Sequence, residues 1–136
     1  MSSDAGAYAD YPHRELTEKV IGCAIHVHRE LGPGYLESIY ENALAHELRK
    51  RGLSVDTQYE VPVVYDNVKV GLHRADILVD GAVVVELKSV EALVPKHKAQ
   101  LISTLKAVGA SVGLLMNFNE ARLAQGLKRV VLTGKK

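Results

Sequence analysis

The sequence of 136 residues contains a single cysteine, no tryptophan and almost no surplus of charge of either sign. Cys23 cannot form an intramolecular disulfide and lies in a helical apolar pattern, so we expect a reduced, buried thiol in a cytoplasmic protein. The formal net charge of +1 excludes a strongly basic surface as the basis for binding a polyanion, although a local basic patch is compatible with it.

Long hydrophobic runs are also missing. No apolar segment approaches the roughly 18 residues that a membrane-spanning helix needs. The first residues, SSDAGAYADYPHR, lack the basic and apolar regions of a signal peptide. We therefore expect neither membrane insertion nor export. A hydrophobic content of 47% and a charged content of 24% are typical of a folded domain, so we predict a flexible N-terminal arm over residues 1–13 and one domain over 14–136.

Apolar periodicity predicts two helices in the first part of this domain. The first covers residues 15–31 and is stopped by the segment Gly-Pro-Gly at 32–34. The second covers residues 36–51, and Gly52 supplies its C-terminal cap. His26 and His28 are two positions apart on the first helix, so they point to different sides and make a poor metal pair.

The chemistry of residues 53–87 is typical of β-structure, and predicts about three antiparallel strands in a meander. Asp66-Asn67 and Asp80-Gly81 supply the turns, and Pro62 indicates an edge strand or a bulge. Pro95 then begins a helix that ends near Gly109. After it we predict a buried strand over 111–116, a short helix over 120–125 and a last strand over 128–132.

Charged residues interrupt two of these apolar strands. Glu86 and Lys88 fall within VVVELKS, residues 83–89, and point to the same side because side chains alternate along a strand. A surface ion pair on an edge strand is the plain explanation. Asp76 interrupts the preceding strand, and the intervening loop decides its orientation. A two-residue loop would place Asp76 and Glu86 on opposite faces, whereas a three-residue loop with Gly81 left-handed would place them on one face.

If the two carboxylates share a face, they repel each other unless a cation lies between them. One or two carboxylates, completed by water and phosphate oxygens, form the kind of site that Mg²⁺ favours. A neighbouring lysine can orient or deprotonate an attacking water, or stabilise negative charge on phosphorus. This combination of Asp76, Glu86 and Lys88 predicts metal-assisted hydrolysis of a phosphodiester.

Asp76, followed ten residues later by Glu86-Leu87-Lys88, resembles the D-(x)n-ExK signature of the PD-(D/E)xK nuclease superfamily. The segment GYLESIY, residues 34–40, resembles the G-x-x-E-x-x-Y motif of the GxxExxY protein family, and similarity to that family extends over about residues 16–132. The resemblance implies an α/β, restriction-endonuclease-like fold with an αβββαβ core and a mixed central sheet flanked by helices. It also implies binding of nucleic acid, DNA or RNA.

The same resemblance implies roles for individual residues. Asp76 and Glu86 become ligands of Mg²⁺, for which Mn²⁺ is the expected substitute, and Lys88 becomes the catalytic lysine. Glu37 becomes an additional acidic residue that reaches the metal directly or through water. Acidic residues are also favoured in the first turn of a helix by the helix dipole, which is a sufficient alternative reason for Glu37.

Further positions match the superfamily less completely. In exonuclease-like branches a glutamine and a tyrosine from the third helix line the active site; here Gln100 matches the glutamine, whereas Thr104 stands where the tyrosine is expected. Ala75 replaces the proline that precedes the aspartate. Tyr40 is expected to be a core residue with a hydrogen-bonded hydroxyl. His73 and Arg74 precede Asp76 and could bind phosphate; Arg74 could equally be an ion-pair partner of a strand carboxylate.

Three functions therefore compete. The first is a Mg²⁺-dependent nuclease. The second is a catalytically inactive nuclease fold that serves as a binding or assembly module and forms a homo-oligomer. The third is a metal-dependent hydrolase of a small phosphorylated molecule, which would need a deep closed pocket rather than an open groove.

Overall fold

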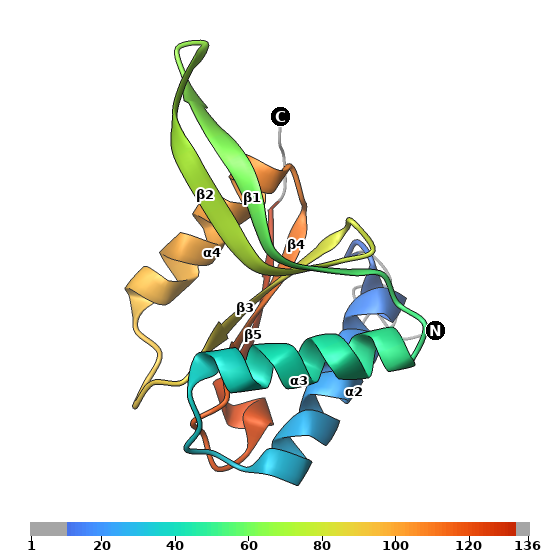
Figure 1. The fold of residues 1–136 in the computed structure, drawn as a ribbon. Helices are drawn as coiled ribbons and strands as arrows, with labels where there is room; N and C mark the ends of the chain where they lie inside the picture. Colours follow the sequence, from blue (N-terminus) through green and yellow to red (C-terminus); the bar gives the residue numbers. More distant parts are fainter. Residues whose placement is uncertain (1–10, 133–136) are drawn as a thin grey trace, which may run out of the picture.

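The computed structural model describes residues 11–132 and has an α/β architecture (Figure 1). In chain order its elements are α2 (Arg14–Leu31), α3 (Glu37–Lys50), β1 (Val55–Tyr65), β2 (Val68–Val79), β3 (Val83–Lys88), α4 (Pro95–Val108), β4 (Val112–Asn117), the 3-10 helix η1 (Leu123–Gly126) and β5 (Leu127–Val131). This order confirms the predicted restriction-endonuclease-like succession of elements. Most of the predicted arm, residues 1–10, and the end of the predicted domain, residues 133–136, lie outside the described residues, and the domain limits stay a prediction.

The five strands form one sheet in the order β1-β2-β3-β4-β5. β3 and β4 are parallel, and the other neighbouring strands are antiparallel. The mixed sheet follows from the connections, because tight turns join β1 to β2 and β2 to β3, whereas α4 provides the crossover that two parallel strands require. β3 is therefore an inner strand, and the explanation of Glu86 and Lys88 as a pair on an edge strand is wrong.

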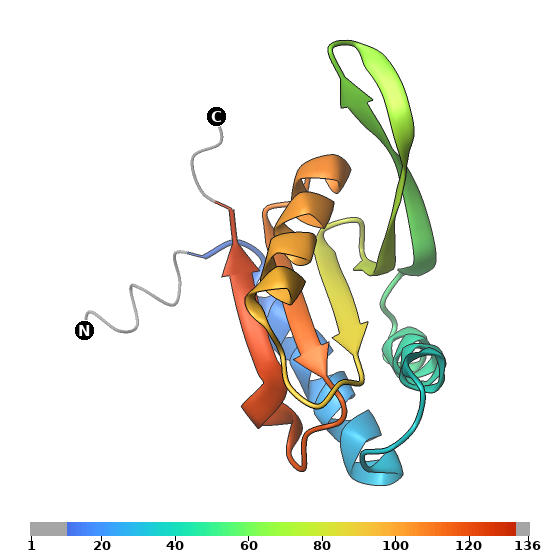
Figure 2. The ribbon, with the colours of Figure 1, turned by 90° about the vertical axis from the view of Figure 1, so that its left-hand side faces the viewer.

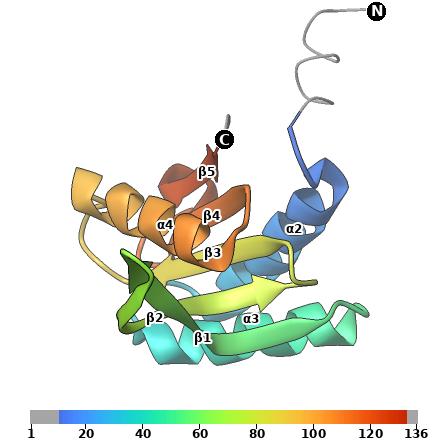
Figure 3. The ribbon, with the colours of Figure 1, turned by 90° about the horizontal axis from the view of Figure 1, so that it is seen from above.

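Helices cover both faces of the sheet, as the view from above shows (Figure 3). On one face, α2 and α3 pack against alternate residues of the inner strands, such as Ile77 and Val85. On the other face, Leu101 and Leu105 of α4 pack against residues such as Val84. Burial on both faces explains why β3 and β4 are nearly continuous apolar runs. A charged residue on β3 therefore lies among core side chains unless the helices leave it an opening.

The GYLESIY segment is held in place by its final tyrosine. Tyr40 is fully buried and stacks on Phe118, with the ring centroids 4.7 Å apart. Its hydroxyl donates to the Gly32 carbonyl at 2.6 Å and accepts the Tyr35 N–H at 3.1 Å. This confirms a core role with a hydrogen-bonded hydroxyl. The two bonds close the loop that leads into α3, so they set where Glu37 begins that helix.

The β1–β2 hairpin extends well beyond the body of the molecule (Figures 1 and 2). Its tip at Asp66 and Asn67 has positive φ angles of 53° and 63°, as a tight hairpin turn requires. β1 is an edge strand, and its register with β2 shifts between Val63 and Val64, next to Pro62. Both readings of Pro62 are confirmed. Seven large apolar side chains of the hairpin are exposed: Tyr59, Val63, Val64, Tyr65, Val68, Val70 and Leu72.

Other details of the sequence pattern hold, with one difference. Cys23 is a buried free cysteine, and burial raises the pKa of its thiol. His28 is buried and its Nε2 lies 2.9 Å from the Glu120 carbonyl, whereas His26 is exposed, so one histidine is packed and the other faces solvent. The expected short helix over 120–125 is a single 3-10 turn that starts later, at 123.

None of the helices in the described part of the chain combines the length and the apolar character needed to cross a membrane.

Candidate active site

The loop between β2 and β3 decides whether the two strand carboxylates meet. It contains three residues, 80–82, because the ladder on either side of it is Val79↔Val83, Leu78↔Val84 and Ile77↔Val85. Asp80 and Gly81 have positive φ angles of 52° and 65°. One step beyond the last pair, this register places Asp76 opposite Glu86 on the same face of the sheet. The three-residue loop with a left-handed Gly81 is thus confirmed.

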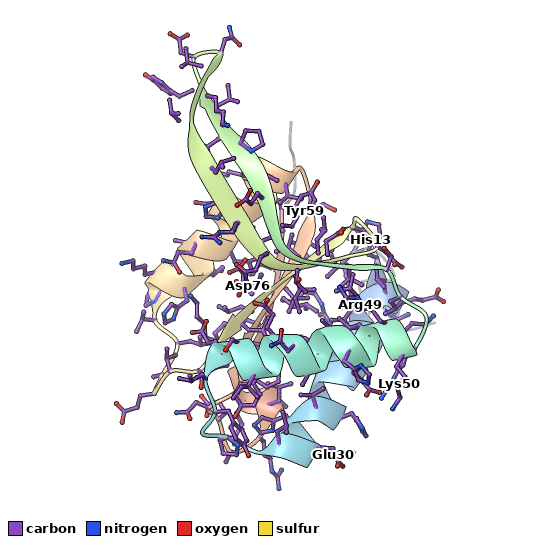
Figure 4. The ribbon with its side chains drawn as sticks, viewed as in Figure 1. His13, Glu30, Arg49, Lys50, Tyr59 and Asp76 are labelled. Atoms are coloured by element: carbon purple, nitrogen blue, oxygen red, sulfur yellow. The ribbon has the colours of Figure 1, made fainter. Side chains whose placement is uncertain are left out.

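The two carboxyl groups occupy the position where the regular β2–β3 ladder ends. The Leu87 N–H donates to Asp76 Oδ2 at 2.9 Å, and the Asp76 N–H donates to Glu86 Oε2 at a longer 3.4 Å. Each carboxylate therefore bonds to the backbone of the opposite strand. Glu86 is only 9% exposed, and Asp76 is half-buried. Figure 4 shows Asp76 at the root of the β1–β2 hairpin, near α3.

Burial and mutual repulsion oppose ionisation of this pair. Burial, and next the negative charge of Asp76, raise the pKa of Glu86 to about 8. Burial also raises the pKa of Asp76, against the Leu87 N–H bond and the positive charge of Lys88, which lower it. Lys88 shares the Glu86 side of β3, but the ion pairs among residues 11–132 lie elsewhere, on α2 and α3. Within the described residues Lys88 therefore acts on the pair at a distance, and neither carboxyl forms an ion pair.

A divalent cation fits this pair of residues. Two adjacent buried carboxylates with no ion-pair partner in residues 11–132 are the anionic half of a hard-cation site, and Mg²⁺ takes its other ligands from water and phosphate. Across the described residues, no group of three or more His, Cys, Asp or Glu side chains is arranged to hold a metal ion. Within residues 11–132, the protein itself thus offers two carboxylates at this place.

Glu37 lies at the margin of this pair. It is the first residue of α3 and is exposed, and its negative charge contributes to raising the pKa of Glu86. It is therefore close enough to act electrostatically on the site without joining a three-residue metal group. Its role stays a prediction.

Gln100 is exposed on α4, and its carbonyl accepts the Thr104 hydroxyl at 3.0 Å. Thr104 is buried, and its Oγ1 lies 2.7 Å from His73 Nε2. Since the Thr104 proton is donated to Gln100, Nε2 of His73 must carry the proton of the second bond. His73 is thus bonded inside the protein to the residue at the expected tyrosine position, which leaves Nδ1 for other partners. The role of Gln100 stays a prediction.

Two polar residues near Asp76 escaped the sequence analysis. Gln58 of β1 lies opposite Asp76, between the pairs Thr57↔Ile77 and Tyr59↔Ala75. Its Nε2 donates to Glu41 Oε1 of α3 at 2.8 Å. Burial raises the pKa of Glu41, and the charges of Asp76 and Glu37 raise it further. Glu41 follows Glu37 by one helical turn, so the i, i+4 spacing was a usable signal. Gln58 offered no signal in the sequence, since a lone glutamine in an edge strand is common.

A family model described as the PD-(D/E)XK nuclease superfamily matches residues 14–130. The match covers every element from α2 to β5 almost completely, and it includes Glu37, Asp76, Glu86, Lys88 and Gln100. Neither the curated proteins nor the solved structures include one with significant similarity to the chain. Because the match spans most of the chain and agrees with the order of its elements, the protein belongs to the PD-(D/E)XK nuclease superfamily.

Proposed function

We propose that this protein is a Mg²⁺-dependent nuclease that hydrolyses phosphodiester bonds of DNA or RNA, with Mn²⁺ able to replace Mg²⁺. The observation that carries the proposal is the buried pair of Asp76 and Glu86 with Lys88 on the same side of β3. We also assign the chain to the GxxExxY family, on the GYLESIY segment and the hydrogen bonds of its Tyr40. A cytoplasmic location completes the proposal.

In this proposal, Asp76 and Glu86 hold the cation. The Leu87 N–H bonds Oδ2 of Asp76 and the Asp76 N–H bonds Oε2 of Glu86, which leaves the second oxygen of each carboxylate to face the ion. When bound, the ion would polarise the phosphate and lower the pKa of its water. Burial, and next the negative charge of Asp76, raise the pKa of Glu86, and a bound cation would oppose both effects and favour the ionised carboxylate.

Lys88 acts on the water or the phosphate. Its backbone is fixed by pairing with Asn117 in the parallel ladder and by the Phe118 N–H, which donates to the Lys88 carbonyl at 2.8 Å. An ammonium group has three donors and no acceptor, so it can orient a water while it stabilises charge on a phosphate oxygen. Glu37 would reach the ion through water, and Gln100, in the first half of α4, would contact the substrate.

Cleavage assays with matched variants test this function. Wild-type protein should cleave at least one of single-stranded DNA, double-stranded DNA and RNA with Mg²⁺ or Mn²⁺, and EDTA should abolish the reaction. Glu86→Gln and Lys88→Met should reduce the rate at least ~100-fold. Glu30→Gln and Lys19→Met change the same residue types at exposed positions of α2 and should retain full activity. Metal-independent cleavage, or full activity of Glu86→Gln, would refute the proposal.

The exposed hairpin favours a second role, self-association. Its seven apolar side chains are each 37–74% exposed and together expose on the order of several hundred Å², which is large for a monomer. The occupant we propose is a second copy of this chain. Two such hairpins, each with its flanking polar residues, would approach the roughly 800 Å² per partner of a standard interface. A two-fold arrangement lets the same surface serve both copies.

The oligomeric state tests this role. Light scattering during gel filtration should give twice the chain mass, and Val64→Glu, which puts a charge on the exposed hairpin, should give the monomer. A monomeric wild type over a wide concentration range would refute it. A dimer without cleavage of any nucleic acid would instead favour the inactive assembly module. The hydrolase of a small molecule has less support: a cavity of about 530 Å³ in the described part of the chain is lined by residues of α2, by Gly32 and Pro33 and by segment 121–124, and not by Asp76 or Glu86.

A further inference from the structure

Gln58 has an unusual backbone conformation for its position. Its φ angle is 50°, in the left-handed region that side chains other than glycine rarely adopt. The other described non-glycine residues with positive φ are the N-cap of α2 and residues of the two hairpin turns. Within the strands of the described chain, Gln58 alone has this geometry. Such a conformation costs folding free energy and persists when the surroundings impose it.

The side-chain amide of Gln58 accounts for this backbone conformation, because it joins two neighbouring elements. Its amide donates to Glu41 Oε1 at 2.8 Å, which connects β1 to α3. The strand register places Gln58 opposite Asp76, between the pairs Thr57↔Ile77 and Tyr59↔Ala75, and the Gln58 side chain acts to lower the pKa of Asp76. An amide nitrogen has two hydrogens, so one side chain can donate to both carboxylates. Gln58 thus stands between a helix and the strand carboxylate that faces Glu86.

The acceptors also define which end of the amide faces the site. Glu41 and Asp76 are both carboxyl groups, which accept hydrogen bonds when ionised, so the amide nitrogen and not the oxygen must face them. An oxygen turned toward Asp76 would repel it. Glu41 therefore has a part in the arrangement, because its bond keeps the amide from flipping.

We propose that Gln58 is a positioning residue, which orients the Asp76 carboxylate toward Glu86 so that the pair can hold a divalent cation. The strained backbone at position 58 is the cost of bringing the amide to that place. This inference rests on the proposed metal-dependent function. It adds a residue from β1, the strand farthest from β5, to a site otherwise built on β2 and β3.

The variant Gln58→Gly separates positioning from ordinary structural support. Glycine accepts a positive φ without strain, and it removes the amide. In EDTA, the melting temperature of Gln58→Gly should therefore equal or exceed that of wild type. Its Mn²⁺ affinity, measured by electron paramagnetic resonance of the free ion, should fall about 10-fold or more, as is usual when a group that orients a metal ligand is removed. Gln125→Ala changes an exposed glutamine of η1 and should alter neither quantity.

The outcomes distinguish this inference from the proposed function. If wild-type protein binds no Mn²⁺, both are overturned. If wild type binds Mn²⁺ and Gln58→Gly binds it equally well, the positioning role is overturned and the metal site stands. If Gln58→Gly loses affinity and also melts well below wild type, Gln58 supports the fold and the positioning role is overturned. Lower affinity with an unchanged or higher melting temperature supports the inference.

Discussion

The buried carboxyl of Glu86 should make the stability of the metal-free protein depend on pH. Its pKa is raised from 4.5 to about 8 in the folded protein. Between these two pH values the unfolded chain releases the proton of Glu86 while the folded protein keeps it. The free energy of unfolding is therefore highest below pH 4.5 and falls as the pH rises to about 8. One pKa unit corresponds to about 1.4 kcal/mol, so the total loss is on the order of 3 to 5 kcal/mol.

The variant Glu86→Gln keeps the shape of the side chain and cannot ionise. In EDTA, its free energy of unfolding at pH 8 should exceed that of wild type by roughly 3 kcal/mol or more, and the difference should shrink to less than about 1 kcal/mol near pH 4.5. Urea unfolding followed by circular dichroism at several pH values measures this difference. Taking variant minus wild type removes the titration of the groups that do not interact with Glu86, and leaves that of Glu86 and its neighbour Asp76.

Saturating Mg²⁺ should narrow this difference at pH 8. A ligand that binds only the folded state stabilises it by about 2.7 kcal/mol at 100 times its dissociation constant. Wild type should gain this stability, whereas Glu86→Gln, which has lost one of the two carboxylates, should gain much less. The description of Glu86 as a buried, repelled carboxyl would be refuted if the difference in unfolding free energy between the two proteins did not change with pH and Mg²⁺ stabilised both equally.

The remaining predictions concern the lysine, the motif tyrosine and α4. Lys88→Met should bind Mn²⁺ within about threefold of wild type while its cleavage rate falls at least ~100-fold, because the ammonium acts on water or phosphate and not on the metal; equal loss of binding and rate would contradict this. Tyr40→Phe should keep the ring packing but leave the Gly32 carbonyl without its hydroxyl donor, which lowers the unfolding free energy by about 1 to 3 kcal/mol in urea titrations; an unchanged value would argue against the bond. Thr104→Val should destabilise the protein by a similar ~1 to 3 kcal/mol, because it removes the partner of His73, and wild-type stability would show that this bond contributes nothing.

Local signals predicted most of the fold. The ends of α2 and α3 agree with the predicted ends within about one residue, because glycine and proline at 32–34 and Gly52 terminate the helices by backbone geometry alone. Asp80 and Gly81 belong to the same class of signal, since their left-handed conformations set the loop length. Loop length sets the register, and the register places Asp76 opposite Glu86. The central pair of the site was therefore accessible from the sequence.

The residues that surround Asp76 and Glu86 could not be predicted from the sequence. Gln58 bonds to Glu41 and lies opposite Asp76 only because β1, α3 and β2 meet, and no local pattern encodes an arrangement of three separate elements. The bond between His73 and Thr104 has the same origin, since it joins β2 to α4. Glu37 and Glu41 were visible as charges one turn apart, but their distances to the strands depend on how α3 packs. Sequence patterns indicate which face a residue occupies, and tertiary packing decides which residue it meets.

Crystals grown with Mn²⁺ provide the most direct test of the central claim, which is that Asp76 and Glu86 together hold a divalent cation. We expect an anomalous peak within about 2.5 Å of an oxygen of each carboxylate, with water completing the coordination. Glu86→Gln crystals under the same conditions should show no such peak. A wild-type structure with full occupancy of Mn²⁺ elsewhere, or with Asp76 and Glu86 bonded only to protein in saturating Mn²⁺, would contradict the claim.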